Sequence, residues 1–219
     1  YFVNCDAVVL QNGDILTVTS YRNKEVYRYH PELAGIYLRR STDGGRTWSA
    51  ETSIYKGVNW EPSIIELSSG EIQIFFSQVS PGIARWGLKE NRNSTGTAMI
   101  SSADGGYTWT PEVKEGDKNN FVALRIYKEF IGNRIPKVKD KEYTEAIPYW
   151  GGQMPAVTTL CNGKSLLAVE LSTLTSGFKI SLATSEAGGK WRALNFEEEG
   201  PDTMIHSICD GMGPYLALG

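Results

Sequence analysis

The sequence predicts an all-β protein, a β-propeller built from repeated four-stranded units, and three observations favour this fold. A hairpin made of an apolar strand, a small-residue turn and a second apolar strand recurs three times. Each of these hairpins is followed by another, and two of the second hairpins carry the same eight-residue turn. Hydrophobic residues make up 41% and charged residues 21% of the 219 residues, which is ordinary for a globular protein. The pattern therefore predicts consecutive propeller blades.

The first hairpin of each unit is indicated by its turn. Asparagine and glycine tolerate positive φ, so Asn-Gly between two apolar runs strongly indicates a hairpin. The predicted hairpins are Ala7–Ser20, turning at Asn12-Gly13; Ser63–Ser77, turning at Ser69-Gly70; and Ala156–Ser172, turning at Asn162-Gly163.

The second hairpins carry a motif that we call the box turn. The two full copies are Ser41-Thr42-Asp43-Gly44-Gly45-Arg46-Thr47-Trp48 and Ser102-Ala103-Asp104-Gly105-Gly106-Tyr107-Thr108-Trp109. The third unit keeps a degenerate copy, Thr184–Trp191. We expect the aspartate to accept N–H groups of its own turn, and the tryptophan to pack under its blade as an apolar plug. The box turn therefore indicates the fold and is not expected to bind substrate.

The spacing of these features predicts one propeller domain over residues 1–219. Blade one would cover 1–58, blade two 59–150 and blade three 151–200, and 201–219 would begin a fourth blade. Blades close into rings of about four to eight members, because an open stack exposes strand edges. We expect six blades in the complete ring, with the remaining blades in another chain or in further sequence.

Composition excludes several classes of function. The formal net charge of -3 argues against a nucleic-acid partner. No apolar run approaches the roughly 18–20 residues that cross a bilayer, so no membrane span is expected. Three cysteines cannot all pair with one another, and the spacing of the cysteines and the two histidines fits no zinc site. No metal and no organic cofactor are expected.

Superimposing the hairpin glycines places two glutamates at one end of the blades. Glu61 stands nine residues before Gly70, and Glu170 stands seven residues after Gly163. Residues about equally distant from a hairpin turn lie side by side at its open end. Strand direction puts the box turns at the opposite end. We therefore expect the candidate site at the glutamate end.

Other side chains suited to binding a sugar are predicted at the same end. Aromatic rings stack on sugar faces, and charged or amide groups hold hydroxyls and carboxylates. The candidates are Arg22, Trp60, Arg85, Trp86, Trp150, Gln153, His206 and Asp210. The alternative is that the glutamates are solvated strand ends and that the aromatic residues pack between blades.

The box turns resemble the Asp boxes of the sialidase superfamily of glycosidases. Within it, the stretch 59–73, which begins Asn59-Trp60-Glu61-Pro62, resembles a blade start of the sialidase-fold exo-arabinanases. Gln153–Val157 and Leu167–Glu170 resemble later stretches of the same family. In that family a pair of glutamates does the chemistry. The resemblance implies that Glu61 is the acid/base and Glu170 the nucleophile.

The resulting expectation is a secreted or periplasmic retaining glycoside hydrolase that removes terminal sugars. Its two carboxyl groups should lie about 5–5.5 Å apart. An apolar setting supplied by Trp60 would raise the pKa of Glu61, and Asp6 is a reserve acid. One alternative is an exo-sialidase, for which an Arg-Ile-Pro motif would be expected where the chain has Val3–Asp6. The other is a non-catalytic glycan-binding propeller.

Overall fold

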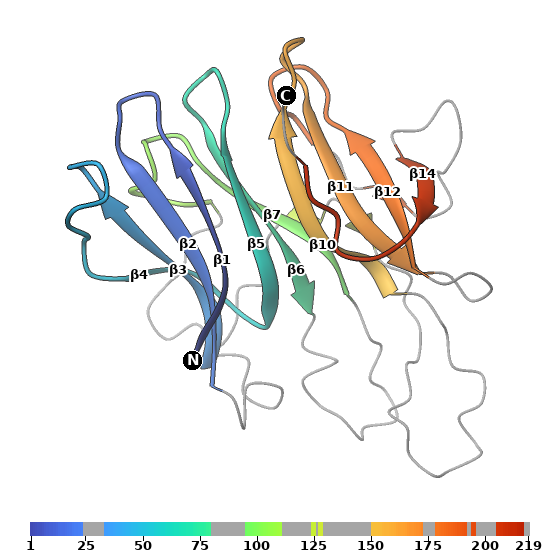
Figure 1. Ribbon diagram of the computed structural model, residues 1–219, viewed down its shortest axis with the longest axis horizontal. Helices are drawn as coiled ribbons and strands as arrows, with labels where there is room; N and C mark the ends of the chain where they lie inside the picture. Colours follow the sequence, from blue (N-terminus) through green and yellow to red (C-terminus); the bar gives the residue numbers. More distant parts are fainter. Residues whose placement is uncertain are drawn as a thin grey trace.

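The computed structural model describes residues 1–23, 33–79, 95–110, 124–125, 127–128, 150–172, 178–191, 194–195 and 205–216. These residues form three four-stranded antiparallel sheets that lie side by side (Figure 1). In this part of the chain no helix is long and apolar enough to cross a membrane.

Each sheet is built from strands in chain order. The first contains β1 (Phe2–Val9), β2 (Ile15–Arg22), β3 (Ala34–Ser41) and β4 (Thr52–Lys56). The second contains β5 (Asn59–Glu66), β6 (Ile72–Val79), β7 (Thr95–Ser102) and β8 (Leu124–Arg125). The third contains β10 (Trp150–Thr159), β11 (Ser165–Ser172), β12 (Phe178–Thr184) and β14 (Ile205–Asp210). Two short strands, β9 (Tyr127–Lys128) and β13 (Leu194–Asn195), pair in parallel.

The three predicted hairpins are confirmed. They join β1 to β2, β5 to β6, and β10 to β11. Their turn glycines, Gly13, Gly70 and Gly163, have φ of 90°, 84° and 77°. Each glycine N–H donates to a carbonyl three residues earlier, as in a tight turn.

The end of the third unit differs from the prediction. Residues 201–219 were expected to begin a fourth blade, but β14 pairs with β12 and completes the third sheet. Residues 211–216 after it form no strand. The physical reason is that β12 has a free edge, and β14 fills it after a connection longer than in the first sheet.

Apolar side chains fill the two spaces between neighbouring sheets. One core joins the first sheet to the second and includes Leu16, Ile36, Ile74 and Phe76. A smaller core joins the second sheet to the third and includes Phe75, Leu167 and Val169. The first strands contact in turn, β1 with β5 and β5 with β10. The sheets therefore pack face to face with their first strands adjacent, as propeller blades do.

Polar contacts repeat between successive sheets. The Asp6 carboxylate accepts the Ile64 N–H at 3.0 Å, and the Ser63 hydroxyl, at the equivalent position one sheet later, accepts the Val157 N–H at 3.4 Å. Asp6 also accepts the N–H of Ala7. The prediction of Asp6 as a reserve acid finds no support in this geometry, because both carboxylate oxygens are engaged in backbone contacts.

The box turns have the hydrogen bonds that their sequence predicts. Asp104 accepts the Thr108 N–H at 2.9 Å and the Thr108 hydroxyl at 2.6 Å, and Asp43 makes the same two bonds with Thr47 at 2.8 and 2.6 Å. These bonds hold the pKa of Asp43 at about 2, and the equivalent bonds hold the pKa of Asp104 well below its ordinary value.

The tryptophans of the two full box turns differ in burial. Trp109 is 7% exposed and joins the core between the first and second sheets. Trp48 is 39% exposed, so the prediction of a buried plug is wrong for this residue. The second and third box turns pack against the sheet before their own, through Arg40 with Gly105 and through Gln73 with Gly189. None of the described strands lies on that side of the first sheet.

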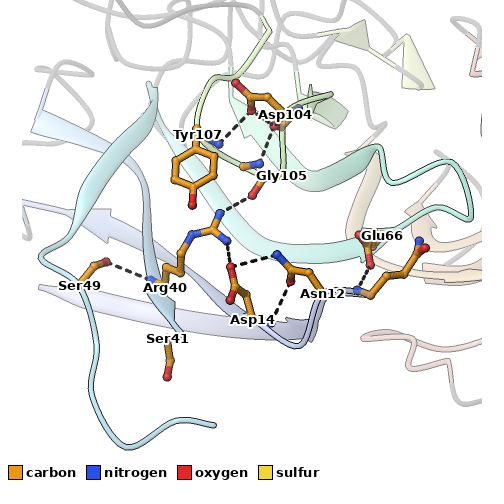
Figure 2. A network of polar contacts seen from close by, with 12 residues as sticks. Asn12, Asp14, Arg40, Ser41, Ser49, Glu66, Asp104, Gly105 and Tyr107 are labelled. Atoms are coloured by element: carbon orange, nitrogen blue, oxygen red, sulfur yellow. Dashed lines mark hydrogen bonds and ion pairs between the residues drawn. The ribbon is translucent and has the colours of Figure 1, made fainter. Parts of the chain in front are cut away.

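An arginine ties the first sheet to the second box turn. Figure 2 shows Arg40 between the Asp14 carboxylate, 2.5 Å away, and the carbonyl of Gly105, to which it donates. Its guanidinium carbon lies 4.4 Å from the centroid of the Tyr107 ring. This network lies at the same end of the sheets as the hairpin turns, since Ile15 pairs with Ser41 and Ile72 with Ser102. We call the opposite end, where β1, β5 and β10 begin, the mouth.

Candidate active site

The first strand of every sheet contains a β-bulge near the mouth. The register shifts by one residue between Val3 and Cys5 in β1 and between Trp60 and Ser63 in β5. In β10 the equivalent shift lies between Gln153 and Ala156, and a second one lies between Trp150 and Gln153. The extra residue is in each case a non-glycine residue with positive φ: Asn4 at 50°, Glu61 at 45° and Met154 at 50°. Such a conformation costs an L-residue about 1–3 kcal/mol and is concentrated at functional sites.

Beside each bulge stands an equivalent residue of the second strand. Ser20, Ser77 and Glu170 pair with Val3, Trp60 and Gln153, the residues directly before the bulges. The glutamates thus come from different strands of neighbouring sheets, Glu61 from a bulge in β5 and Glu170 from β11.

Glu61 is held by one hydroxyl and lies near charges of both signs. Its Oε2 accepts a hydrogen bond from the Ser77 hydroxyl at 3.1 Å. Burial raises the pKa of the Glu61 carboxyl above its ordinary value, the hydrogen bond from Ser77 and the positive charge of Arg22 act against this rise, and the negative charge of Glu170 adds to it. A carboxyl in this setting keeps its proton to higher pH than an exposed glutamate.

Glu170 is 6% exposed and is held by a backbone group. Gly213, which follows β14, donates its N–H to Glu170 Oε2 at 3.1 Å. Burial raises the pKa of Glu170, and the bond from Gly213 opposes the rise. Within the part of the chain that the structure describes, Oε1 accepts no hydrogen bond, so one oxygen is anchored and the other is not.

Arg22 and Trp60 form one unit beside Glu61. The Arg22 guanidinium carbon lies 5.4 Å from the Trp60 ring centroid, within the range of a cation–π contact. Arg22 donates to the side-chain oxygen of Asn4 at 3.2 Å. Trp60 also packs against Ala34 and Val58. Trp60 therefore supports the arginine whose charge acts on Glu61, a contact that the sequence did not suggest.

Gln153 lies directly beside Glu170 in the strand pairing of β10 with β11. Its Nε2 is buried and finds no hydrogen-bond partner among the described residues. A buried amide without a partner is costly, about 1–3 kcal/mol, unless a ligand or water satisfies it.

Of the remaining predicted residues, the structure describes the side chain of Asp210 alone. Asp210 ends β14, the outermost strand of its sheet, and is exposed. Trp150 begins β10 and His206 lies within β14, but their side chains lie outside the described residues, as do Arg85 and Trp86 altogether. Among the described residues, no group of three histidine, cysteine, aspartate or glutamate side chains could hold a metal ion.

Three contributors to the cluster were not predicted. Ser77 and Asn4 occupy positions that the hairpin alignment had marked, but neither side chain carries a catalytic signature. Gly213 acts through its backbone N–H, which no side-chain motif reports. Its φ of 63° is positive, a property that only the structure reports.

No protein-family model and no curated sequence matches the chain. Among solved structures, it is similar to an α-L-arabinofuranosidase of Fusarium graminearum, with a TM-score of 0.57 and 14% identity over 94% of this chain and 50% of that one. An α-L-arabinanase of Penicillium chrysogenum gives 0.50 and 18% over 85% and 47%. A Hadza microbial sialidase gives 0.52 and 14% over 87% and 36%. The fold is that of sialidase-like and arabinanase-like glycoside hydrolases.

The chain spans about half the length of the arabinofuranosidase and the arabinanase. In this propeller fold, Glu61 and Glu170 lie at the mouth, on neighbouring blades. At 14–18% identity the likeness establishes the fold, and the reaction has to be argued from the mouth itself.

Proposed function

We propose that the protein is a retaining glycoside hydrolase that removes terminal sugars, with Glu61 as acid/base and Glu170 as nucleophile. The observation that carries this proposal is the placement of two carboxyls at the mouth on neighbouring sheets, Glu61 in the bulge of β5 and Glu170 on β11. The negative charge of Glu170 also acts on Glu61. A charged carboxylate beside a protonated one is the arrangement that retaining hydrolysis needs.

The proposed reaction has two steps. Glu61 protonates the glycosidic oxygen while Glu170 Oε1 attacks the anomeric carbon, and the leaving sugar departs as an alcohol. Water then gives a proton to the Glu61 carboxylate and attacks the anomeric carbon, which releases the sugar and restores Glu170 as a carboxylate. Two inversions give net retention. The bond from Gly213 to Oε2 leaves Oε1 as the attacking oxygen.

Terminal α-L-arabinofuranosyl residues are the substrate that we favour. The motif Trp60-Glu61-Pro62 and the fold likeness to an arabinofuranosidase and an arabinanase support this choice. Arg22 and Gln153 would bind sugar hydroxyls. We further expect a secreted or periplasmic location, and remaining blades supplied by another chain or by further sequence.

A sialidase is the second candidate, because Arg22 places a buried cation beside Glu61 and because the fold is also similar to a sialidase. Arginine binds carboxylates in a fork geometry that an acidic sugar would fit.

The test is hydrolysis by the purified protein of 4-nitrophenyl α-L-arabinofuranoside, arabino-oligosaccharides and a sialic acid aryl glycoside. We expect Glu170→Gln to lower kcat at least about 10³-fold and Glu61→Gln about 10²–10⁴-fold on oligosaccharides. Glu66→Gln is the matched control, because Glu66 lies at the other end of β5 and accepts the Gln11 N–H.

Proton NMR of the first product should show an unchanged anomeric configuration. Inversion, or full activity of Glu170→Gln, would contradict the mechanism. Sugar that binds and is recovered intact would favour the non-catalytic glycan-binding alternative, and cleavage of the sialic acid glycoside alone would favour the sialidase.

A further inference from the structure

Ser77 connects the two bulges that stand on either side of it at the mouth. Its hydroxyl donates to Glu61 Oε2 at 3.1 Å and accepts the backbone N–H of Met154 at 2.8 Å. Glu61 and Met154 are the equivalent bulge residues of the second and third sheets, and both have positive φ. The side chain of Ser77 is 1% exposed, so water does not compete for these bonds.

The two bonds fix the direction of the Ser77 hydroxyl hydrogen. A backbone N–H can only donate, so the serine oxygen is the acceptor of the Met154 bond. The O–H hydrogen is then free for Glu61 Oε2, which accepts it whether the carboxyl is charged or neutral. When Ser77 donates to Oε2 in the neutral form as well, the carboxyl proton is on Oε1, the oxygen turned away from Ser77.

We propose that Ser77 is the positioning residue of Glu61: it sets the carboxyl orientation, directs the acid proton to Oε1 and ties that orientation to the third sheet. This proposal rests on the proposed role of Glu61 as acid/base. It adds a residue that the motif around Glu61 does not contain and that lies on another strand, β6.

The repeat itself contains the comparison that isolates this role. Ser20 stands at the equivalent position of the first sheet and is 0% exposed, but it donates to the Asn59 side chain at 2.7 Å. In the third sheet the same position is Glu170. A buried serine here is thus no general requirement of the strand pairing, and Ser20 serves as a control with the same burial and the same chemistry.

Removal of the Ser77 hydroxyl should raise the pKa of Glu61. The charged groups that act on Glu61 are Arg22 from β2 and Glu170 from β11, and Ser77→Ala leaves both in place. The bond from Ser77 stabilises the charged carboxylate. Its loss makes the carboxylate less stable, so the Glu61 pKa rises further above its ordinary value.

The experiment compares Ser77→Ala, Ser77→Thr and Ser20→Ala in the purified protein. In Ser77→Ala, we expect kcat/KM on oligosaccharides to fall on the order of ten-fold. The fall is smaller on aryl glycosides, whose leaving groups need little protonation. The alkaline limb of the pH profile moves to higher pH. Ser77→Thr retains a hydroxyl and should restore the wild-type pH profile. Ser20→Ala should leave both kcat/KM and the pH profile unchanged.

An infrared titration provides the readout that needs no catalysis. The protonated carboxyl band that Glu61→Gln removes reports the Glu61 pKa directly. This pKa should rise in Ser77→Ala and remain unchanged in Ser20→Ala. An unchanged Glu61 pKa in Ser77→Ala, or equal loss of activity in the two alanine variants, overturns the positioning role. If the band shifts as expected while Glu61→Gln stays fully active, the proposed function has failed and the Ser77–Glu61 contact has not.

Discussion

At the scale of single residues, the two mouth glutamates are held by different kinds of group. A side-chain hydroxyl donates to Glu61 and a backbone N–H donates to Glu170. Burial raises the pKa of both carboxyls, and a charged Glu170 raises that of Glu61 further. Because repulsion between negative charges is unfavourable, a charged Glu170 favours the protonated form of Glu61.

These raised pKa values predict a loss of stability with increasing pH. A glutamate whose pKa is higher in the folded protein holds its proton more tightly there than in the unfolded chain. Stability is therefore greatest below the ordinary value of 4.5 and decreases as pH rises through the folded pKa. Glu61→Gln removes this loss, so at pH 7 we expect its Tm to exceed that of the wild type by roughly 2–4 °C.

Thermal unfolding between pH 4 and pH 8 measures this difference. The gain in Tm should shrink towards pH 4, where the wild-type carboxyl is protonated. A gap between the two proteins that is constant with pH would contradict the assignment of the raised pKa to Glu61.

Part of the residue-scale site could be predicted from the sequence. The positions of Glu61 and Glu170 could be predicted from their distances in sequence to the hairpin glycines. In an antiparallel hairpin, residues about equally distant from the turn lie side by side. The orientation of their carboxyls could not be predicted, because it depends on Ser77 and on a backbone N–H of Gly213, which lies 43 residues beyond Glu170. The backbone contacts of Asp6 could not be predicted either, because a carboxylate that accepts backbone N–H groups has the same sequence signature as an acid.

At the scale of elements, the box turn is a hydrogen-bonded unit that can pack against a neighbouring sheet. Its aspartate satisfies the backbone of the turn, and its tryptophan donates to a glycine carbonyl of the same turn, as Trp109 does to Gly106 at 3.2 Å. The turn is similar in both full copies, yet only Trp109 is buried against a neighbouring sheet. Docking, and not the turn itself, therefore decides how much each copy stabilises the fold.

Replacing the two tryptophans should reveal this difference. We expect Trp109→Ala to lower the free energy of unfolding by about 3 kcal/mol, because it opens a cavity in the core between the sheets. Trp48→Ala should cost about 1 kcal/mol, because Trp48 is already partly in water. Urea denaturation of the two variants measures both values, and equal losses would show that the turns and not their docking carry the stability.

The elements themselves could be largely predicted, and the bulges could not. Asn-Gly and Ser-Gly turns fix the hairpins because few residues tolerate positive φ. A bulge whose extra residue has positive φ is usually marked in the sequence by a glycine. Here the extra residue is an asparagine, a glutamate and a methionine in the three sheets. The assignment of β14 was missed because a short apolar run cannot indicate whether it ends one sheet or begins the next.

At the scale of the whole molecule, neighbouring sheets are joined by contacts between the box turn of one unit and the sheet that precedes it in the chain. The second box turn packs on the first sheet through Arg40, and Gln73 of the second sheet donates to the Gly189 carbonyl of the third unit at 2.9 Å. Glu61 and Glu170 lie on either side of one such boundary. The geometry of the mouth therefore depends on the packing between sheets as much as on either sheet alone.

The Arg40 network of Figure 2 should contribute measurably to this packing. Arg40 and Asp14 are both largely buried, so Arg40→Met leaves a carboxylate without its cation and should cost about 2 kcal/mol. The control is Arg39→Met, because the ion pair of Arg39 with Glu51 is exposed and should contribute no more than about 0.5 kcal/mol.

A double-mutant cycle with Asp14→Asn checks the assignment by urea denaturation. The loss in Arg40→Met should shrink when Asp14 is already neutral, since the isolated charge is then gone. Additive losses would mean that Arg40 acts through its contacts with Gly105 and Tyr107 alone.

The recurrence of one bulge with three different residues has a consequence for how chemistry can change on this scaffold. The backbone has a similar conformation at the bulge position of each sheet, where the residues are Asn4, Glu61 and Met154. This position accepts side chains with an amide, a carboxyl or a thioether. A substitution here would therefore change the chemistry of the mouth and leave the fold of the blade intact. Under the proposed function, single substitutions at these positions would give new activities, because the backbone already places them at the mouth.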